Sequence, residues 1–155
     1  QELVARRHGY EGWQALKTGL SDMPKAATTT SENNIQTAKP QLWVRDLQAS
    51  IDFYTQKLGL KLVIHYGNPP FYAHVERDGA TFILRCIDRP VIDAALRDAE
   101  TLLAAEMSCA DVKGLFEEYL VDGVPMVRGL KKEPWGARNF IIRDPDGNML
   151  LFAGE

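Results

Sequence analysis

The chain contains one pattern of strands and a helix twice, and this duplication constrains the fold more than any other feature. The first copy predicts a strand, a helix and three strands, at 41–46, 47–59, 60–66, 71–76 and 81–86. The second copy predicts the same order at 104–111, 111–123, 124–127, 137–143 and 148–153. Matching positions recur at a nearly constant offset, since 65 residues separate Asp46 from Asp111 and 68 separate Gly79 from Gly147. Two βαβββ modules of this size should pair, because neither can bury its own sheet alone.

Local signals support the individual elements. Leu47, Ile51, Tyr54 and Leu58 recur at helical spacing on one face of the segment 47–59, and Gly59 suits the end of that helix. The Asp-Gly pair after Arg77 and the longer Asp-Pro-Asp-Gly turn at 144–147 each predict a hairpin. The sequence therefore predicts an α+β fold, in which two tandem modules form one curved mixed sheet around a cavity.

The duplication leaves the beginning of the chain outside the predicted domain. Residues 1–20 show a helical spacing of Tyr10, Trp13, Leu16 and Leu20, which predicts a helical appendage. The segment 21–38 is polar, rich in threonine and without periodicity, as a linker would be. The main domain is expected to cover 39–155, with its modules at about 40–86 and 103–154.

Composition narrows the classes of function. The chain is 45% hydrophobic, which is typical of a globular core, and its net charge of −3 gives no reason to expect nucleic acid binding. No apolar run is long enough to span a bilayer, and no signal segment is apparent, so a cytoplasmic protein without a membrane partner is expected. Cys86 and Cys109 lie in apolar strands and are expected to be free thiols rather than a disulfide or a metal site.

Strand side chains alternate between two faces, so one register per strand predicts which residues face the cavity. In the first module, the apolar set that contains Leu42, Val44 and Leu84 should meet the helices, and the opposite set should face inward: Lys39, Gln41, Trp43, Tyr72, His74, Glu76, Thr81, Ile83 and Arg85. In the second module, the strand at 137–143 is aligned with the strand at 71–76 by an offset of 66 residues, and this alignment predicts which of its side chains face inward. The inward set expected there is Glu106, Ser108, Arg138, Phe140, Ile142, Met149, Leu151 and Ala153.

The two modules resemble those of a known group. VRDLQASIDFYTQKLGL opens the first module and RDPDGNMLLFAG closes the second, and both are similar to motifs of the vicinal oxygen chelate superfamily, which includes glyoxalases, extradiol dioxygenases and bleomycin resistance proteins. PPFYAHVERDG and EPWGARNF make the chain most similar to the bleomycin-resistance-like branch. The resemblance covers about 39–154 and implies a homodimer, in which two chains complete two clefts.

Metal-dependent members of that superfamily hold their ion at four equivalent strand positions. The resemblance places these positions at Lys39, Ile83, Ala104 and Leu151 in this chain. None of them is a histidine, carboxylate or amide, the side chains that divalent ions require. No nucleotide or phosphate motif is present either. No metal and no cofactor are therefore expected.

The inward faces instead combine aromatic and charged side chains, as small-molecule sites do. The residues expected to bind a ligand are Trp43, Tyr72, His74, Arg85, Glu106, Trp135, Arg138 and Phe140. A structural role is the alternative for several of them, with Trp43 and Phe140 filling the sheet interior and Arg85 pairing with Glu106. His74 and Glu76 are the only candidates for proton transfer, and His74 could equally be a hydrogen-bonded wall residue.

The leading hypothesis is a metal-free binding protein that sequesters an aromatic or heteroaromatic compound, neutral or cationic. One alternative is an enzyme of the same fold, a lyase, transferase or ring-cleaving enzyme, with unrecognised catalytic groups or metal ligands. Another is a regulatory or scaffold module, in which residues 1–38 bind a partner.

Overall fold

The computed structural model describes residues 36–155, and residues 38–155 form one compact unit. The predicted appendage at 1–20 and most of the predicted linker at 21–38 lie outside the described residues. Between residues 36 and 155, no helix is long and apolar enough to cross a membrane.

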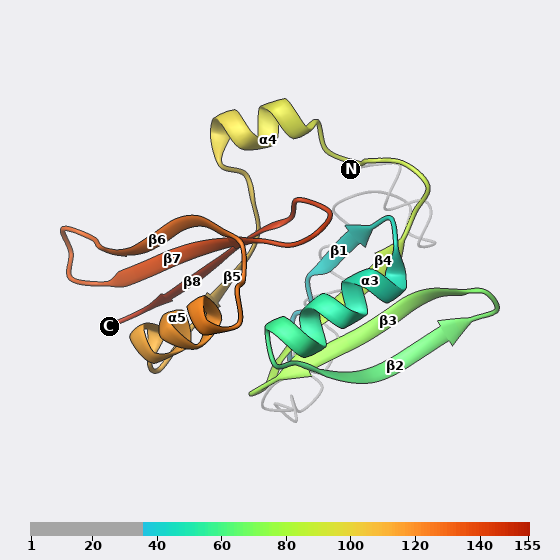
Figure 1. Ribbon diagram of the computed structural model, residues 1–155, viewed down its shortest axis with the longest axis horizontal. Coiled ribbons are helices and arrows are strands. Elements are labelled where there is room, and N and C mark those ends of the chain that lie inside the picture. Colours follow the sequence, from blue (N-terminus) through green and yellow to red (C-terminus); the bar gives the residue numbers. More distant parts are fainter. Residues whose placement is uncertain (1–35) are drawn as a thin grey trace, which may run out of the picture. The chain divides into compact units, whose positions relative to one another are not determined.

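The first module contains the predicted order of elements (Figure 1). They are β1 (Gln41–Val44), α3 (Leu47–Asp52), the π-helical turn η1 (Phe53–Lys57), β2 (Lys61–Gly67), β3 (Pro70–Arg77) and β4 (Ala80–Cys86). The predicted helix at 47–59 is thus an α-helix that ends in a π turn, in which the Leu58 N–H donates to the carbonyl oxygen of Phe53 at 3.3 Å.

The second module repeats this order after a connector. The connector contains a short helix, α4 (Ala94–Glu100). The elements that follow are β5 (Leu103–Ser108), α5 (Val112–Val121), β6 (Met126–Lys132), β7 (Arg138–Arg143) and β8 (Met149–Gly154). Strand β6 extends five residues beyond the predicted strand at 124–127, because its second half is polar and does not show the alternation on which the prediction relied.

The same local chemistry starts both module helices. Asp46 precedes α3 and accepts a hydrogen bond from the Ala49 N–H at 3.0 Å, and Asp111 precedes α5 and accepts one from the Gly114 N–H at 2.8 Å. Each aspartate satisfies one of the N–H groups that a helix leaves unpaired at its start. The duplicated aspartates noted in the sequence are therefore helix caps.

The strands form two mixed sheets of four. Their orders are β1-β4-β3-β2 and β5-β8-β7-β6. In each sheet the first strand of the module runs parallel to the last, and the remaining pairs are antiparallel. The α+β class and the two tandem βαβββ modules are confirmed, and the strands form two sheets rather than the single continuous sheet of the prediction.

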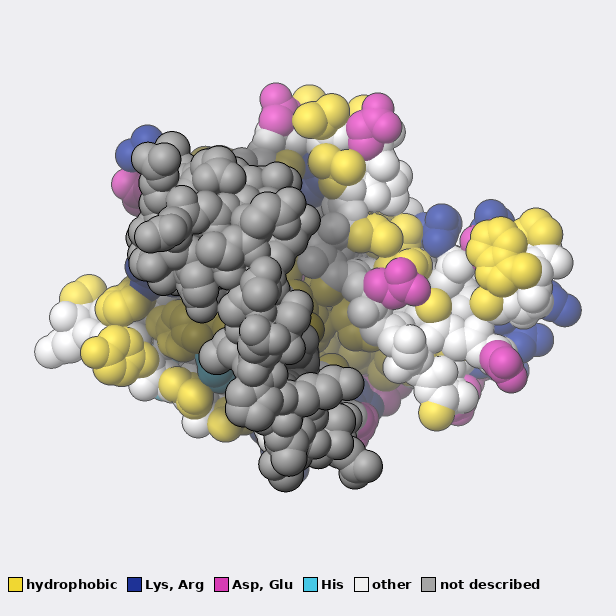
Figure 2. Space-filling view, turned by 180° about the vertical axis from the view of Figure 1, so that it is seen from behind, with side chains coloured by type: hydrophobic (Ala, Val, Ile, Leu, Met, Phe, Trp, Pro, Cys, Tyr) yellow, Lys and Arg dark blue, Asp and Glu magenta, His cyan; other side chains and the backbone are white. Residues whose placement is uncertain are grey.

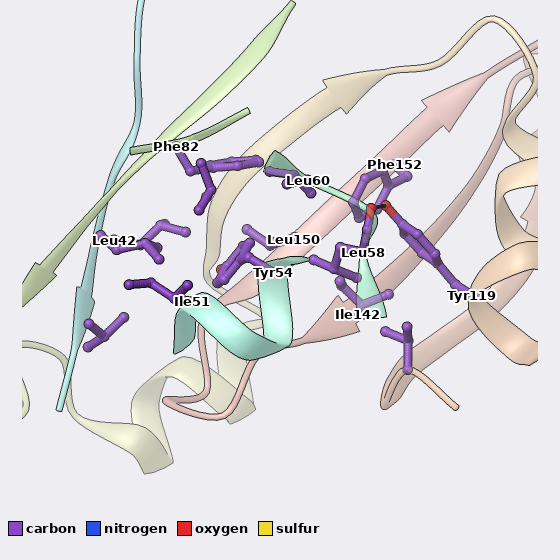
Figure 3. Close-up of a cluster of buried hydrophobic side chains, with 14 of the residues drawn as sticks. Leu42, Ile51, Tyr54, Leu58, Leu60, Phe82, Tyr119, Ile142, Leu150 and Phe152 are labelled. Atoms are coloured by element: carbon purple, nitrogen blue, oxygen red, sulfur yellow. Dashed lines mark hydrogen bonds between the residues drawn. The ribbon is translucent and has the colours of Figure 1, made fainter. Parts of the chain in front are cut away.

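One core joins the helix-covered faces of both sheets (Figure 3). It contains Leu42, Val75 and Leu84 from the first sheet, together with Ile142 and Phe152 from the second. Tyr54 and Leu58, from η1 and its end, lie among these side chains. Each sheet therefore has one face in the common core. The other face of the first sheet remains available for a site, whereas Ile141 and Met149 on the other face of the second sheet are buried as well.

Polar contacts also connect the modules. The Tyr54 hydroxyl donates to Asp144 Oδ2 at 2.9 Å, which ties η1 to the turn between β7 and β8. The guanidinium of Arg77, at the end of β3, donates to both carboxylate oxygens of Glu118 in α5, at 2.6 and 3.0 Å. These contacts fix the β7–β8 turn and helix α5 against the first module.

Candidate functional site

The candidate site is the face of the first sheet that points away from the core, which we call the open face. Its residues lie in adjacent positions across three strands, because strand register brings them together. One row consists of Trp43 on β1, Arg85 on β4 and Tyr72 on β3. The next row places Ile83 beside His74. The face is completed by Gln41, Thr81 and Glu76.

The opposite face shows why the register is fixed. Leu42, Val44, Ala73, Val75 and Leu84 alternate with the open-face residues and are essentially inaccessible to solvent. A slip of one residue would place this apolar set in solvent, at a cost of about 1.5–3 kcal/mol for each large side chain. The core therefore determines that Trp43, Tyr72, His74 and Arg85 share one face, as predicted from the sequence.

Trp43 and Tyr72 provide flat apolar surface on either side of Arg85. Trp43 is 37% exposed, and Tyr72 and Arg85 are half-buried. The guanidinium carbon of Arg85 lies 4.3 Å from the centre of the ring of Phe71, the residue before Tyr72 on β3. The alternative pairing of Arg85 with Glu106 is absent from the ion pairs of the described residues. This row can accommodate a planar ligand beside a positive charge.

Tyr72 and His74 form a hydrogen-bonded pair two residues apart on β3. The Tyr72 hydroxyl lies 2.8 Å from His74 Nε2, and the two ring centres are 5.2 Å apart. Burial lowers the pKa of His74 below its ordinary value of 6.5, and the positive charge of Lys39 lowers it further. The imidazole is therefore neutral at pH 7, and the pair presents a polar but uncharged edge to a ligand.

The structure corrects the prediction for three residues of the second sheet, Arg138, Phe140 and Ile142, which share the core-facing side of β7. Phe140 pairs with Phe152 and is fully buried in the common core, where the two rings stack 5.0 Å apart. Arg138 shares that side of β7, at its exposed start. The cause is the offset: Val75 and Ile142 occupy equivalent places, and 67 rather than 66 residues separate them. A shift of one residue moves every side chain of a strand to the other face.

The remaining predicted residues lie outside the row of Trp43, Arg85 and Tyr72. Glu106 is exposed on β5, where it borders a cleft of about 320 Å³ together with Thr81 and Ser108. Trp135 lies in the turn between β6 and β7 and is 76% exposed. Figure 2 shows hydrophobic side chains gathered at the ends of the β2–β3 hairpin, on the left, and of the β6–β7 hairpin, on the right. Of the predicted ligand-binding residues, the structure brings together Trp43, Tyr72, His74 and Arg85.

Sequence reasoning missed a polar cluster on the second sheet. Arg128 Nη2 donates to Asn139 Oδ1 at 2.5 Å, and Asn139 Nδ2 donates to Glu133 Oε1 at 3.2 Å. Lys131 Nζ also donates to Glu133, at 3.1 Å. The irregular pairing of β6 with β7 brings these residues together, and alternation alone does not reveal it. The mutual pairing of their charges favours a structural role for the cluster.

A second cavity lies on the core side, between the modules. It has a volume of about 580 Å³ and is lined mainly by apolar side chains, among them Leu60, Phe82, Leu115 and Tyr119. The charged side chains on its wall include Arg77 and Glu118, which pair with each other. This cavity is the competing location for a ligand; Asp78 and Asp111 also line it, and it lacks the row of Trp43, Arg85 and Tyr72.

Comparison with known proteins identifies the fold family. Residues 35–152 match the model of the Glyoxalase/Bleomycin resistance protein/Dioxygenase superfamily. The chain belongs to this superfamily. The bleomycin resistance protein of Geobacillus stearothermophilus is 31% identical over 125 residues, which cover 73% of this chain and 92% of that protein. Bleomycin resistance proteins of Staphylococcus aureus match to the same extent.

Solved structures of superfamily members share the fold at lower identity. TioX from Micromonospora sp. ML1 is 20% identical with a TM-score of 0.59, over 77% of this chain and 96% of that one. Lactoylglutathione lyase from Agrobacterium tumefaciens is 16% identical with a TM-score of 0.60, over 79% of this chain and 96% of that one. Because this superfamily fold supports both binding proteins and enzymes, the likeness alone assigns no activity.

The side chains of this superfamily member do not fit the metal site of its metal-dependent relatives. Ile83 pairs with Gln41, and Leu151 pairs with Glu106, so two of the four expected positions carry aliphatic side chains in regular sheet. The other two are Lys39, a cation, and Ala104, which has no donor atom. Among residues 36–155, no group of three or more histidine, cysteine, aspartate or glutamate side chains is arranged to hold a metal ion.

Proposed function

We propose that this superfamily member is a metal-free binding protein that sequesters an aromatic or heteroaromatic compound on its open face. The observation that carries the proposal is the row of Trp43, Arg85 and Tyr72, which combines flat apolar surface with a positive charge. Sites with this composition bind planar ligands through stacking and a few directed polar contacts. Sequestration needs affinity and no catalysis. This role suits a chain in which the four positions that hold the metal ion of metal-dependent relatives carry no side chain suited to a divalent ion. The 31% identity to bleomycin resistance proteins supports this assignment over a catalytic one.

Replacing Trp43 with leucine is expected to weaken binding of a neutral bicyclic aromatic probe, 2-naphthamide, at least tenfold. Leucine retains some apolar contact but loses the ring surface, and a tenfold change corresponds to about 1.4 kcal/mol. Dissociation constants come from isothermal titration calorimetry of chelator-treated, desalted protein. Trp135→Leu is the matched control, because Trp135 is exposed on the second module and should leave the constant unchanged.

The same samples test the catalytic alternative. The Tyr72–His74 pair is the arrangement on the open face that could move a proton. A binding protein returns the probe unchanged, so mass spectrometry after a day of incubation should detect only 2-naphthamide. Unchanged affinity in Trp43→Leu, or conversion of the probe, would contradict the proposal.

We also propose that two copies of the chain pair through the edge of the first sheet. Strand β2 is an edge strand, and its consecutive residues Leu62, Val63 and Ile64 are each more than 40% exposed. Because consecutive residues point to opposite faces, apolar surface is exposed on both sides of this edge, which is a liability for a free strand. Light scattering after size exclusion should give twice the mass of one chain, and Val63→Lys should reduce it to the mass of one.

A cytoplasmic location is part of the same proposal. Cys86 and Cys109 are both free thiols, as is usual in a reducing compartment.

A further inference from the structure

Arg85 is a half-buried arginine without a carboxylate partner among residues 36–155, as is Arg128, which donates to Asn139 instead. Arg77, at the end of the neighbouring strand β3, donates to both carboxylate oxygens of Glu118. Arg143 donates to Asp98 at 2.8 Å. Among residues 36–155, no carboxylate lies within ion-pairing distance of Arg85. Arg85 has a cation–π contact with Phe71 and no carboxylate partner, so its charge is available to a bound anion.

The position of Arg85 leaves its hydrogen-bond donors available. Its guanidinium lies over the Phe71 ring, with the central carbon 4.3 Å from the ring centre. A cation–π contact of this kind holds a guanidinium beside the ring, and no hydrogen bond of Arg85 to residues 36–155 competes for its N–H groups. Trp43 and Tyr72 stand on either side in the same row of the sheet. A ring placed on that row would bring a substituent at its edge within reach of Arg85.

The charges on the open face favour an anion at this end. Glu76 is the carboxylate of the open face. It lies four residues along β3 from Tyr72, the cross-strand neighbour of Arg85. Four residues of a strand span about 13 Å. His74, between them, is neutral at pH 7 because burial and Lys39 lower its pKa. The positive end of the face therefore coincides with its aromatic row.

We propose that the compound bound on the open face carries a planar oxyanion, such as a carboxylate, and that Arg85 binds this group with two parallel N–H donors. The inference deepens the proposed function and rests on it, because it takes the aromatic row as the place of the ring. Guanidinium groups bind carboxylates in this two-pronged geometry more strongly than they bind neutral acceptors. The binding preference of the site is thus for aromatic acids over their neutral analogues.

The test compares 2-naphthoate with 2-naphthamide, which have the same rings and differ in charge. Calorimetry on the wild-type protein should show naphthoate binding about tenfold or more tightly than naphthamide. Arg85→Gln should remove this preference by weakening the binding of naphthoate alone. Arg85→Lys should retain part of the preference, because lysine keeps the positive charge but lacks the two parallel N–H donors. Arg89→Gln is the control, since Arg89 is an exposed arginine of the connector, and it should retain the full preference.

The outcomes separate this inference from the proposed function. If naphthamide binds and naphthoate binds no more tightly, or if the preference survives Arg85→Gln, the anion inference is wrong and aromatic binding stands. If neither compound binds, both fail. Should Arg85→Gln not fold, salt provides the second measurement: raising sodium chloride must weaken naphthoate and leave naphthamide unchanged. Equal responses of the two compounds to salt would overturn the inference.

Discussion

Replacing Phe140 with alanine is expected to lower the free energy of unfolding by about 4 kcal/mol. Phe140 is fully buried, stacks on Phe152 with an angle of 10° between the rings, and lies 5.3 Å from the Phe116 ring and 6.0 Å from the Tyr119 ring. Alanine would leave a cavity among three aromatic rings, which cannot close without moving helix α5. Urea unfolding followed by circular dichroism measures the change.

The same experiment decides the register of β7. Arg138→Ala is the control, because Arg138 lies on the same strand but is exposed at its start, and it should change stability by less than about 0.5 kcal/mol. If Phe140 faced a ligand cavity, as the sequence predicted, its replacement would affect binding more than stability. A loss below about 1 kcal/mol would therefore contradict the core position of Phe140.

Replacing Asp144 with asparagine should cost about 3 kcal/mol, because it disrupts the buried contact between the modules. Asp144 accepts hydrogen bonds from the Tyr54 hydroxyl, from both the backbone and side-chain nitrogens of Asn148, and from the Asp146 N–H. An amide cannot accept from all of these donors, and its own NH₂ group would face some of them. Urea unfolding again gives the measurement.

Asp78 provides the matched control for this change. It occupies the corresponding turn of the first module, between β3 and β4, and its side chain is 90% exposed. Asp78→Asn should therefore alter the free energy of unfolding by less than about 0.5 kcal/mol. Similar losses for the two variants would show that the buried hydrogen bonds of Asp144 do not determine its contribution.

The pH dependence of this difference has a definite sign. Burial raises the pKa of Asp144 above its ordinary value, despite the opposing effect of its hydrogen bonds. The folded protein then binds this proton more readily than the unfolded chain, so the contribution of Asp144 to stability falls as pH rises from about 4 through the raised pKa. The stability advantage of the wild-type protein over Asp144→Asn should therefore widen when the pH is lowered from 7 to 5.

The sequence predicted the modules well because their signals are local and occur twice. Asp46 and Asp111 marked the two helix starts, and both proved to be caps. The open face of the first sheet was predicted correctly, because the apolar residues of β1, β3 and β4 alternate without interruption. One register per strand was then sufficient to place Trp43, Tyr72 and Arg85 together.

The second sheet was harder to predict, for two physical reasons. Its β7–β8 turn is longer than the β3–β4 turn, and the sequence does not show on which strand the extra residues fall, so β7 was placed one residue out of register. All four side chains of β7 from Asn139 to Ile142 are buried, so the strand shows no alternation of apolar and polar residues that would reveal its register. Tyr54 and Asp144 are separated by 90 residues in the sequence, and no local sequence pattern predicts a contact over such a separation.

The location of the bound probe tests the central claim most directly. Nuclear Overhauser contacts between 2-naphthamide and the protein would identify the side chains that surround it. We expect contacts to the ring protons of Trp43 and Tyr72 on the open face. Contacts to Leu60, Phe82 and Tyr119 instead would place the probe in the 580 Å³ cavity between the modules and contradict the account.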